Sequence, residues 1–230
     1  FYNRLLQTKA FLFESIEVTR DVCFREVEII PDDIIENGIT DADMAIFVKA
    51  QMCGMESSIA AASPCGLSTI DYRPAIGIIY FCLENNVLDE EESSSNGSAV
   101  EVAIHEIAHV LGMNSDLFPF FLNPETGYPF VSAANLDTET LTVCADGVPR
   151  RVLQPSSSVL KSGISSTGAR HFEIVTPTVK TVVRNQFDCQ ILTGARLENQ
   201  PTAARDCFGS HWDEVSLFLF GHSFFFTYEI

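Results

Sequence analysis

The segment from Ser98 to Gly112 constrains the fold more than any other part of the chain. Its apolar residues recur at helical spacing, and Ser98 with Glu101 three residues later has the pattern of a capping box. Gly112 stands where such a helix would end. We therefore predict a half-buried helix from Ser98 to about Leu111, whose core-facing side consists of Val100, Ala103, Ile107 and Val110.

The polar side of this helix carries an HExxH pattern that begins at His105. His105 and His109 are four residues apart, so both imidazoles project from one helix face and can bind one metal ion. Glu106 lies about 100° around the axis from His105, where it can reach a metal-bound water without being a ligand. The metal would activate that water, and the carboxylate would carry its proton to a leaving amine. Two histidines on the polar side of a half-buried helix favour this interpretation over a chance occurrence.

The residues alone do not fix a third metal ligand. A catalytic zinc usually has three protein ligands and one open position. Gly112 allows a sharp turn toward a later ligand, but Ser115 occupies the position where the compact form of the motif has a histidine. The ligand must therefore come from farther along the chain. The candidates are three histidines and two glutamates: His171, His211, His222, Glu125 and Glu139.

The rest of the sequence predicts a mixture of helices and strands. One helix is expected at Asn3–Ile16, and another runs from Thr176, as N-cap before Pro177, to about Phe187. Runs of β-branched and aromatic residues predict three strands, at Cys23–Ile30, Met44–Ala50 and Ala75–Phe81. We expect a turn or loop at 66–72, an acidic solvated loop at 89–97, and loops with short strands over 114–170.

Composition excludes several functional classes. The 230 residues include 14 Lys and Arg against 31 Asp and Glu, for a net charge of −17. Such a chain lacks the basic clusters that bind nucleic acid or an anionic membrane surface. The most apolar stretch, Val215–Phe226, is interrupted and too short to cross a bilayer. The chain starts at Phe1 without a signal segment, so we interpret it as a fragment or a processed chain.

The seven cysteines are scattered, with no Cys-x-x-Cys pair, which argues against a thiolate zinc site. Scattered cysteines in an acidic chain favour disulfides formed in an oxidising compartment, and the sequon at Asn96 weakly indicates the same. Buried free thiols are the alternative. The odd number leaves at least one cysteine without a partner in this chain.

Several blocks occur in a recognisable order over residues 1–214: Gly38–Val48, Arg73–Gly77, His105–Gly112, Thr176–Val179, Phe187–Cys189, Leu197–Gln200 and Gly209–Trp212. In this order they resemble the leishmanolysin and invadolysin family of metzincin zinc metalloendopeptidases. The HExxHxxG element alone is shared by many proteases. The last two blocks are much more specific to the family.

The resemblance implies a complete zinc site. It makes His105, His109 and His211 the ligands of one Zn²⁺ per chain and Glu106 the catalytic base. His171 matches no family ligand and is expected to be an ordinary surface or packing histidine. His222 lies in a tail that matches nothing.

The resemblance also bears on substrate binding and on the cysteines. It suggests that Ala75–Phe81 is an edge strand over the cleft, which pairs with the substrate backbone. An ordinary central strand is the alternative. A disulfide between Cys189 and Cys207, near the third ligand, is a further possibility.

The implied fold is α+β and metzincin-like, with a twisted sheet, an active-site helix and a second, irregular subdomain. We place an N-terminal catalytic subdomain at 1–113, an insertion and third-ligand subdomain at 114–214, and an unassigned apolar tail at 215–230. The family has a methionine turn shortly after the third histidine, whereas all four methionines here precede His211. The chain therefore looks like a C-terminally truncated member.

The expected function is hydrolysis of internal peptide bonds in proteins, by metal-activated water with Glu106 as general base. The expected location is extracellular or at the cell surface, and membrane association is left open. The missing methionine turn motivates an alternative, a catalytically impaired, protease-like binding or adhesion protein. Protein or peptide substrates are the expected partners, with no nucleic acid, and the oligomeric state is left open.

Overall fold

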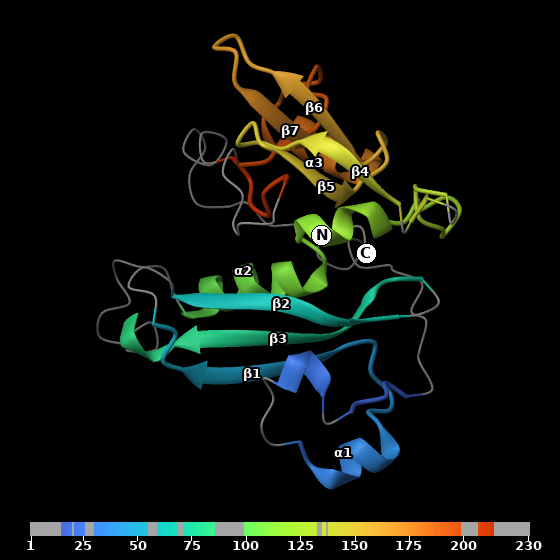
Figure 1. The fold of residues 1–230 in the computed structure, drawn as a ribbon, viewed down its shortest axis with the longest axis vertical. Coiled ribbons are helices and arrows are strands. Elements are labelled where there is room, and N and C mark those ends of the chain that lie inside the picture. The colour runs from blue at the N-terminus through green and yellow to red at the C-terminus, as the bar shows by residue number, and fades with distance from the viewer. Residues whose placement is uncertain are drawn as a thin grey trace. The chain divides into compact units, whose positions relative to one another are not determined.

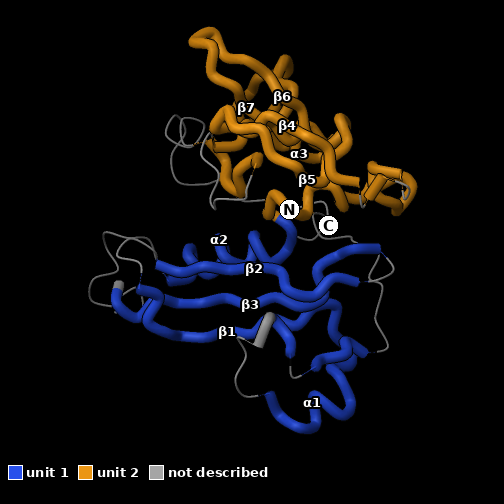
Figure 2. The backbone as a smooth tube through the Cα atoms, in the orientation of Figure 1, with its two compact units in different colours: residues 1–112 blue, residues 113–230 orange. Residues whose placement is uncertain are grey.

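A computed structural model describes residues 15–19, 21–25, 30–54, 59–68, 71–85, 99–132, 135–136, 138–198 and 207–213. The chain divides into two compact units, residues 1–112 and residues 113–230 (Figure 2). The tail expected at 215–230 and the acidic loop at 89–97 lie outside the described residues. No helix in these described ranges combines the length and the apolar character that crossing a membrane requires.

Unit 1 contains a three-stranded mixed sheet with the order β1-β3-β2 (Figure 1). The strands are β1 (Ala45–Gln51), β2 (Ala60–Leu67) and β3 (Pro74–Cys82). β1 runs parallel to β3, with Ala45 opposite Ile76, and β2 runs antiparallel to it. The predicted strands at Met44–Ala50 and Ala75–Phe81 are confirmed. However, β3 lies in the centre of the sheet, so the edge role suggested for Ala75–Phe81 is wrong.

β3 is central because its sequence suits burial on both faces. Ala75, Ile76, Ile78 and Ile79 are all buried, which is the apolar continuity expected of an inner strand. Next to β3, at the edge, lies β2, which sequence patterns did not predict. Gly66 and Leu67 belong to this strand, so the turn expected at these two residues is wrong. Pro64 fits an edge position, because proline has no backbone N–H that a second neighbouring strand could use.

The helix α2 (Ala99–Leu111) contacts β2 and β3, which confirms the predicted helix, whereas its expected cap, Ser98, lies outside the described residues. Val110 is fully buried, and a Cβ added at Gly77 of β3 would lie 2.2 Å from its Cγ1. The helix therefore approaches the central strand at a position where only glycine leaves room. The predicted apolar face is wrong at Val100, which is 65% exposed, because burial is concentrated in the second half of the helix.

The remainder of unit 1 contains short helical elements around the sheet. It includes the 3-10 helices η2 (Val22–Arg25) and η3 (Leu83–Asn85) and the short helix α1 (Asp32–Asn37). The predicted strand at Cys23–Ile30 is wrong over residues 23–25, which form η2. Residues 3–14 of the predicted first helix lie outside the described residues, and Ile16 instead forms a β-bridge with Ile39.

Unit 2 consists of short strands joined by loops, as expected for residues 114–170. After the 3-10 helix η4 come a two-stranded sheet, β4-β5, and a three-stranded antiparallel sheet, β6-β7-β8 (Figure 1). The elements are η4 (Ser115–Phe120), β4 (Glu139–Val143), β5 (Pro149–Leu153), β6 (Leu160–Ile164), β7 (Arg170–Ile174), α3 (Pro177–Gln186) and β8 (Ala195–Arg196).

The start of α3 follows the predicted capping pattern. The Thr176 hydroxyl accepts a hydrogen bond from the backbone N–H of Val179 at 3.4 Å, and Pro177 occupies the first turn. Proline is favoured there because its missing N–H would have no partner within the helix. Val183 faces the core and is buried.

Six of the seven cysteines form three disulfides, Cys23–Cys65, Cys53–Cys82 and Cys144–Cys207. Two lie within unit 1 and one lies within unit 2. Cys189 is the free cysteine, which agrees with the odd count. The suggested bond between Cys189 and Cys207 is wrong, because Cys207 is paired with Cys144 in the core of unit 2.

Candidate metal centre

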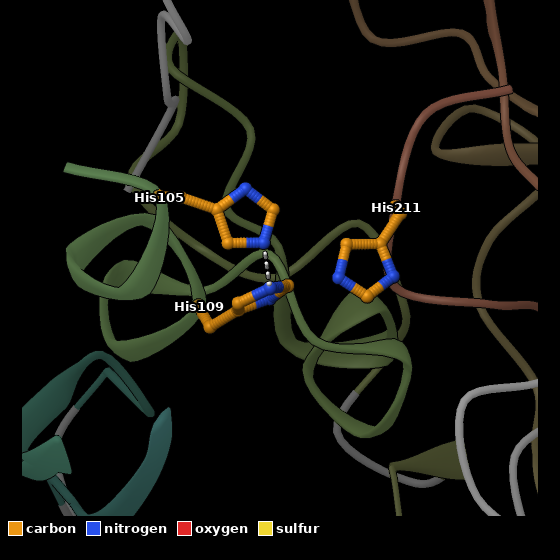
Figure 3. Close-up of side chains that lie close together, drawn as sticks. All are labelled: His105, His109 and His211. Carbon is orange, nitrogen blue, oxygen red and sulfur yellow. Dashed lines mark hydrogen bonds between the residues drawn. The ribbon is translucent and has the colours of Figure 1, made fainter. Parts of the chain in front are cut away.

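The second half of α2 brings two imidazoles together on one face of the helix. The Nε2 atoms of His105 and His109 lie 3.1 Å apart, and the two rings meet edge to face (Figure 3). Residues four apart are neighbours on a helix, so this arrangement follows from the sequence spacing. Both side chains are half-buried.

The histidine pair fits zinc. Two nitrogens bound at 2.0–2.1 Å in a tetrahedral site lie about 3.3 Å from each other, and the observed separation is 3.1 Å. Imidazole nitrogen is also a donor that zinc accepts readily. The pair therefore already has close to the spacing that a shared ion requires.

Glu106 is buried on the same helix, with 6% of its surface exposed. In the described part of the chain it is the only buried residue with a carboxylate. A carboxylate held out of solvent next to metal-ligand candidates is typical of a catalytic group, because burial fixes its position. Glu106 therefore lies on the same helix as the histidine pair and directly follows His105 in the sequence.

The chain turns sharply directly after the helix. Gly112 has φ +132°, and its N–H donates to the His109 carbonyl at 3.2 Å. This φ lies in the region that favours glycine. The helix can therefore end three residues after His109, as the sequence predicts.

His211 lies in unit 2, on a segment that pairs with the chain after β8. The N–H of Glu198 donates to the His211 carbonyl at 2.9 Å, and Leu197 forms a β-bridge with Trp212. Ser210 accepts a hydrogen bond at its Oγ from the backbone N–H of Ser115 at 3.1 Å. The residue before His211 is therefore fixed to a residue only six positions beyond His109.

The other candidate ligands have different surroundings. His171 lies on β7, where its ring fills the space over Gly163 and its Nε2 contacts Glu173 at 3.4 Å, so it is a packing histidine as expected. Glu125 and Glu139 are exposed, in a turn and at the start of β4. His222 lies outside the described residues.

Within the described residues, one group of His, Cys, Asp and Glu side chains could hold a metal ion: His105, His109 and His211 (Figure 3). Sequence reasoning missed Glu198, whose carboxylate contacts His211. It lies in a block that carries the family resemblance, which was the available signal. The contact itself joins residues thirteen positions apart, which no periodic pattern indicates.

Comparisons with known proteins agree on one group. The model of the leishmanolysin peptidase family matches residues 6–140. The chain is 28% identical over 193 residues to the leishmanolysin-like peptidase of Drosophila pseudoobscura pseudoobscura, which covers 77% of this chain and 26% of the relative. It is 34% identical over 104 residues to the ciliated left-right organizer metallopeptidase of Xenopus laevis, covering 43% of this chain and 14% of the relative. The chain thus spans about a quarter or less of the length of these relatives.

Proposed function

The chain belongs to the leishmanolysin family, and on this basis we propose that it carries the catalytic centre of a zinc-dependent endopeptidase. The observation that carries the proposal is the pair of Nε2 atoms on α2, 3.1 Å apart, beside the buried carboxylate of Glu106. The proposed substrates are proteins or peptides, and the proposed reaction is hydrolysis of internal peptide bonds.

We assign the metal to three histidines. His105 and His109 supply two nitrogens from α2, and His211 supplies the third, with one Zn²⁺ per chain. The Ser115–Ser210 hydrogen bond supports this assignment because it ties the residue before His211 to the segment that follows α2. Three protein ligands leave one coordination position for water or substrate, as in catalytic zinc sites.

When bound, zinc supplies a Lewis acid that lowers the pKa of water and polarises the peptide carbonyl. The chain's own contribution to proton transfer is Glu106. Its carboxylate takes a proton from the attacking water and delivers it to the nitrogen of the leaving amine. Burial supports this role, since a carboxylate held out of bulk solvent has a fixed position on α2.

A substrate backbone can be held on β2. This strand is at the edge of the described sheet and contacts α2. An extended peptide added to an edge strand gains main-chain hydrogen bonds that do not depend on its side chains. We therefore propose that the substrate backbone pairs with β2, and not with β3 as the sequence suggested.

We also propose that the chain works outside the cytosol, in the extracellular space or at the cell surface. The support is the set of three disulfides, which persist in oxidising compartments. Twenty per cent charged residues with a net charge of −17 fit a chain that does not bind nucleic acid.

Elemental analysis and a peptidase assay test the proposal together. The wild type should hold about one zinc per chain and cleave a denatured protein substrate in a chelator-sensitive manner. Glu106→Ala should keep its zinc and lose cleavage, because it removes the base and no ligand. His211→Ala should lose most of its zinc, whereas His171→Ala, a histidine outside the site, should lose none.

The outcomes separate the proposal from its alternative. A folded wild type that holds zinc and cleaves nothing would favour the protease-like binding or adhesion protein. Normal cleavage by Glu106→Ala would show that the base lies elsewhere. A His211→Ala variant that retains its full zinc content would rule out His211 as the third ligand.

A further inference from the structure

Glu198 makes three hydrogen bonds to the two residues Ser210 and His211. Its Oε1 lies 2.9 Å from Nδ1 of His211 and 3.2 Å from the backbone nitrogen of Ser210. Its own N–H donates to the His211 carbonyl at 2.9 Å. Glu198 therefore holds the ring of His211, the backbone N–H of Ser210 and the backbone carbonyl of His211.

Glu198 itself stands on a fixed part of unit 2. The residue before it, Leu197, is fully buried and donates its N–H to the Phe172 carbonyl of β7 at 2.9 Å. Leu197 also forms the β-bridge with Trp212. The backbone of Glu198 is thus anchored to the sheet, and its side chain can orient His211 without moving itself.

Gly209 leaves room for the Glu198 side chain. Its φ is +78°, and a Cβ added there would lie 2.7 Å from Cγ of Glu198 and 3.3 Å from Oε1. A side chain at 209 would push the carboxylate away from His211. Packing around Glu198 therefore favours the hydrogen bond to the ring.

This geometry determines which imidazole nitrogen carries the proton. An ionised carboxylate only accepts hydrogen bonds, so Nδ1 of His211 must be the donor. In a neutral imidazole the other nitrogen, Nε2, is then unprotonated and carries a lone pair. A lone pair at Nε2 is what a metal ion needs, and carboxylates that accept from the second nitrogen of a ligand histidine fix its tautomer and its orientation.

We propose that Glu198 is a positioning residue, which holds His211 as the Nδ1–H tautomer and presents its Nε2 as the third metal ligand. The metal part of this proposal rests on the proposed function. The tautomer part does not, because it follows from contacts within unit 2 alone. The two parts can therefore fail separately.

The chain provides a matched control. His171 and Glu173 are a second histidine–carboxylate pair in unit 2, but there the carboxylate lies 3.4 Å from Nε2 and the histidine packs on Gly163. Removing the Glu173 carboxylate changes the charge as much as removing that of Glu198. It should leave His211 unaffected.

The first measurement is the tautomer of His211 in the metal-free protein, by ¹⁵N–¹H correlation NMR at a pH where the ring is neutral. The wild type should show Nδ1–H. Glu198→Gln keeps an oxygen acceptor and should keep this tautomer, whereas Glu198→Met keeps the shape, lacks the acceptor and should shift toward Nε2–H. Glu173→Gln should match the wild type. An Nε2–H tautomer in the wild type would overturn the proposal, even if the Met variant did not fold.

The second measurement is Zn²⁺ affinity, by competition with a chromophoric chelator. Glu198→Met should bind zinc about 10- to 100-fold more weakly, Glu198→Gln should recover most of this loss, and Glu173→Gln should bind as the wild type does. Unchanged affinity in Glu198→Met would overturn the metal part. The wild type could also lack peptidase activity while Glu198→Met binds zinc more weakly than the wild type does. That result would refute the proposed function and support the role of Glu198.

Discussion

Replacing Gly77 with alanine should separate α2 from the sheet that supports it. The new Cβ would lie 2.2 Å from Cγ1 of Val110, 3.0 Å from Cγ2 and 3.2 Å from Cβ. Carbon atoms pack at about 3.5–4.0 Å, so the closest contact is short by roughly 1.3–1.8 Å. Val110 is fully buried, and a valine in a helix has essentially one favoured rotamer. It cannot swing aside, so the helix must move.

The expected cost follows from this overlap. Overpacking a core typically destabilises a protein by about 1–3 kcal/mol. We expect about 3 kcal/mol here, because three atoms of one rigid side chain are crowded together. Val110→Ala alone should cost about 2 kcal/mol, through lost burial and a cavity. In the double variant the alanine at 77 fills part of that cavity, so its cost should be well below the sum of the two.

Hydrogen exchange by mass spectrometry measures the effect where it occurs. In Gly77→Ala, the slowest amides of β3 and α2 should exchange roughly a hundredfold faster. The single tryptophan, Trp212, lies in unit 2, so its fluorescence during urea unfolding should be unchanged and serves as an internal control. Exchange within threefold of the wild type, or costs that simply add in the double variant, would refute the proposed close packing.

Further predictions concern unit 2. The hydrogen bond from Arg150 lowers the pKa of Asp146 to about 2. This pair therefore stabilises the β4-β5 hairpin above about pH 4, and its contribution disappears as the pH falls toward 2. In Arg150→Gln, an NMR titration should find the pKa of Asp146 nearer 3.8. The Cys144–Cys207 disulfide joins residues 63 positions apart, so replacing both cysteines with alanine should destabilise unit 2 by up to about 4 kcal/mol, seen as a lower urea midpoint by tryptophan fluorescence. Alkylation without reductant should modify one thiol per chain, at Cys189, and modification of Cys144 or Cys207 would contradict the pairing.

Local signals predicted the helices α2 and α3. The cap at Thr176 and the proline after it placed the start of α3 correctly, because that interaction involves residues within one turn. The HExxH spacing likewise gave the facing imidazoles of α2. Both features arise from residues within about one turn of a helix, so local sequence patterns are enough to predict them.

Strand β2 shows why other parts could not be predicted. Its sequence, Ala-Ala-Ala-Ser-Pro-Cys-Gly-Leu, has no β-branched or aromatic residue and lacks the usual pattern of a strand. It is extended because β3 offers it a ladder of hydrogen bonds and because Cys65 is bonded to Cys23. Conversely, Cys23 begins an apolar run that looked like a strand, but it packs into the core of unit 1 from a 3-10 turn.

The candidate site also has one part that local spacing predicted and one part that it did not. The spacing on one helix predicted His105, Glu106 and His109 from the residues alone. His211 depended on the family resemblance, because three later histidines were equivalent candidates. Its partner Glu198 became visible only when the backbone after β8 paired with residues 211–213.

The arrangement of disulfides also sets an order for biosynthesis. The four cysteines of unit 1 precede α2 in the sequence, so both disulfides of unit 1 can form before unit 2 has been synthesised. Cys144 then meets Cys189 before Cys207 has been made. A premature bond between the first two would leave Cys207 without its native partner, and thiol–disulfide exchange would have to correct it. The free thiol at 189 is therefore a competitor for the pairing that holds the segment next to His211.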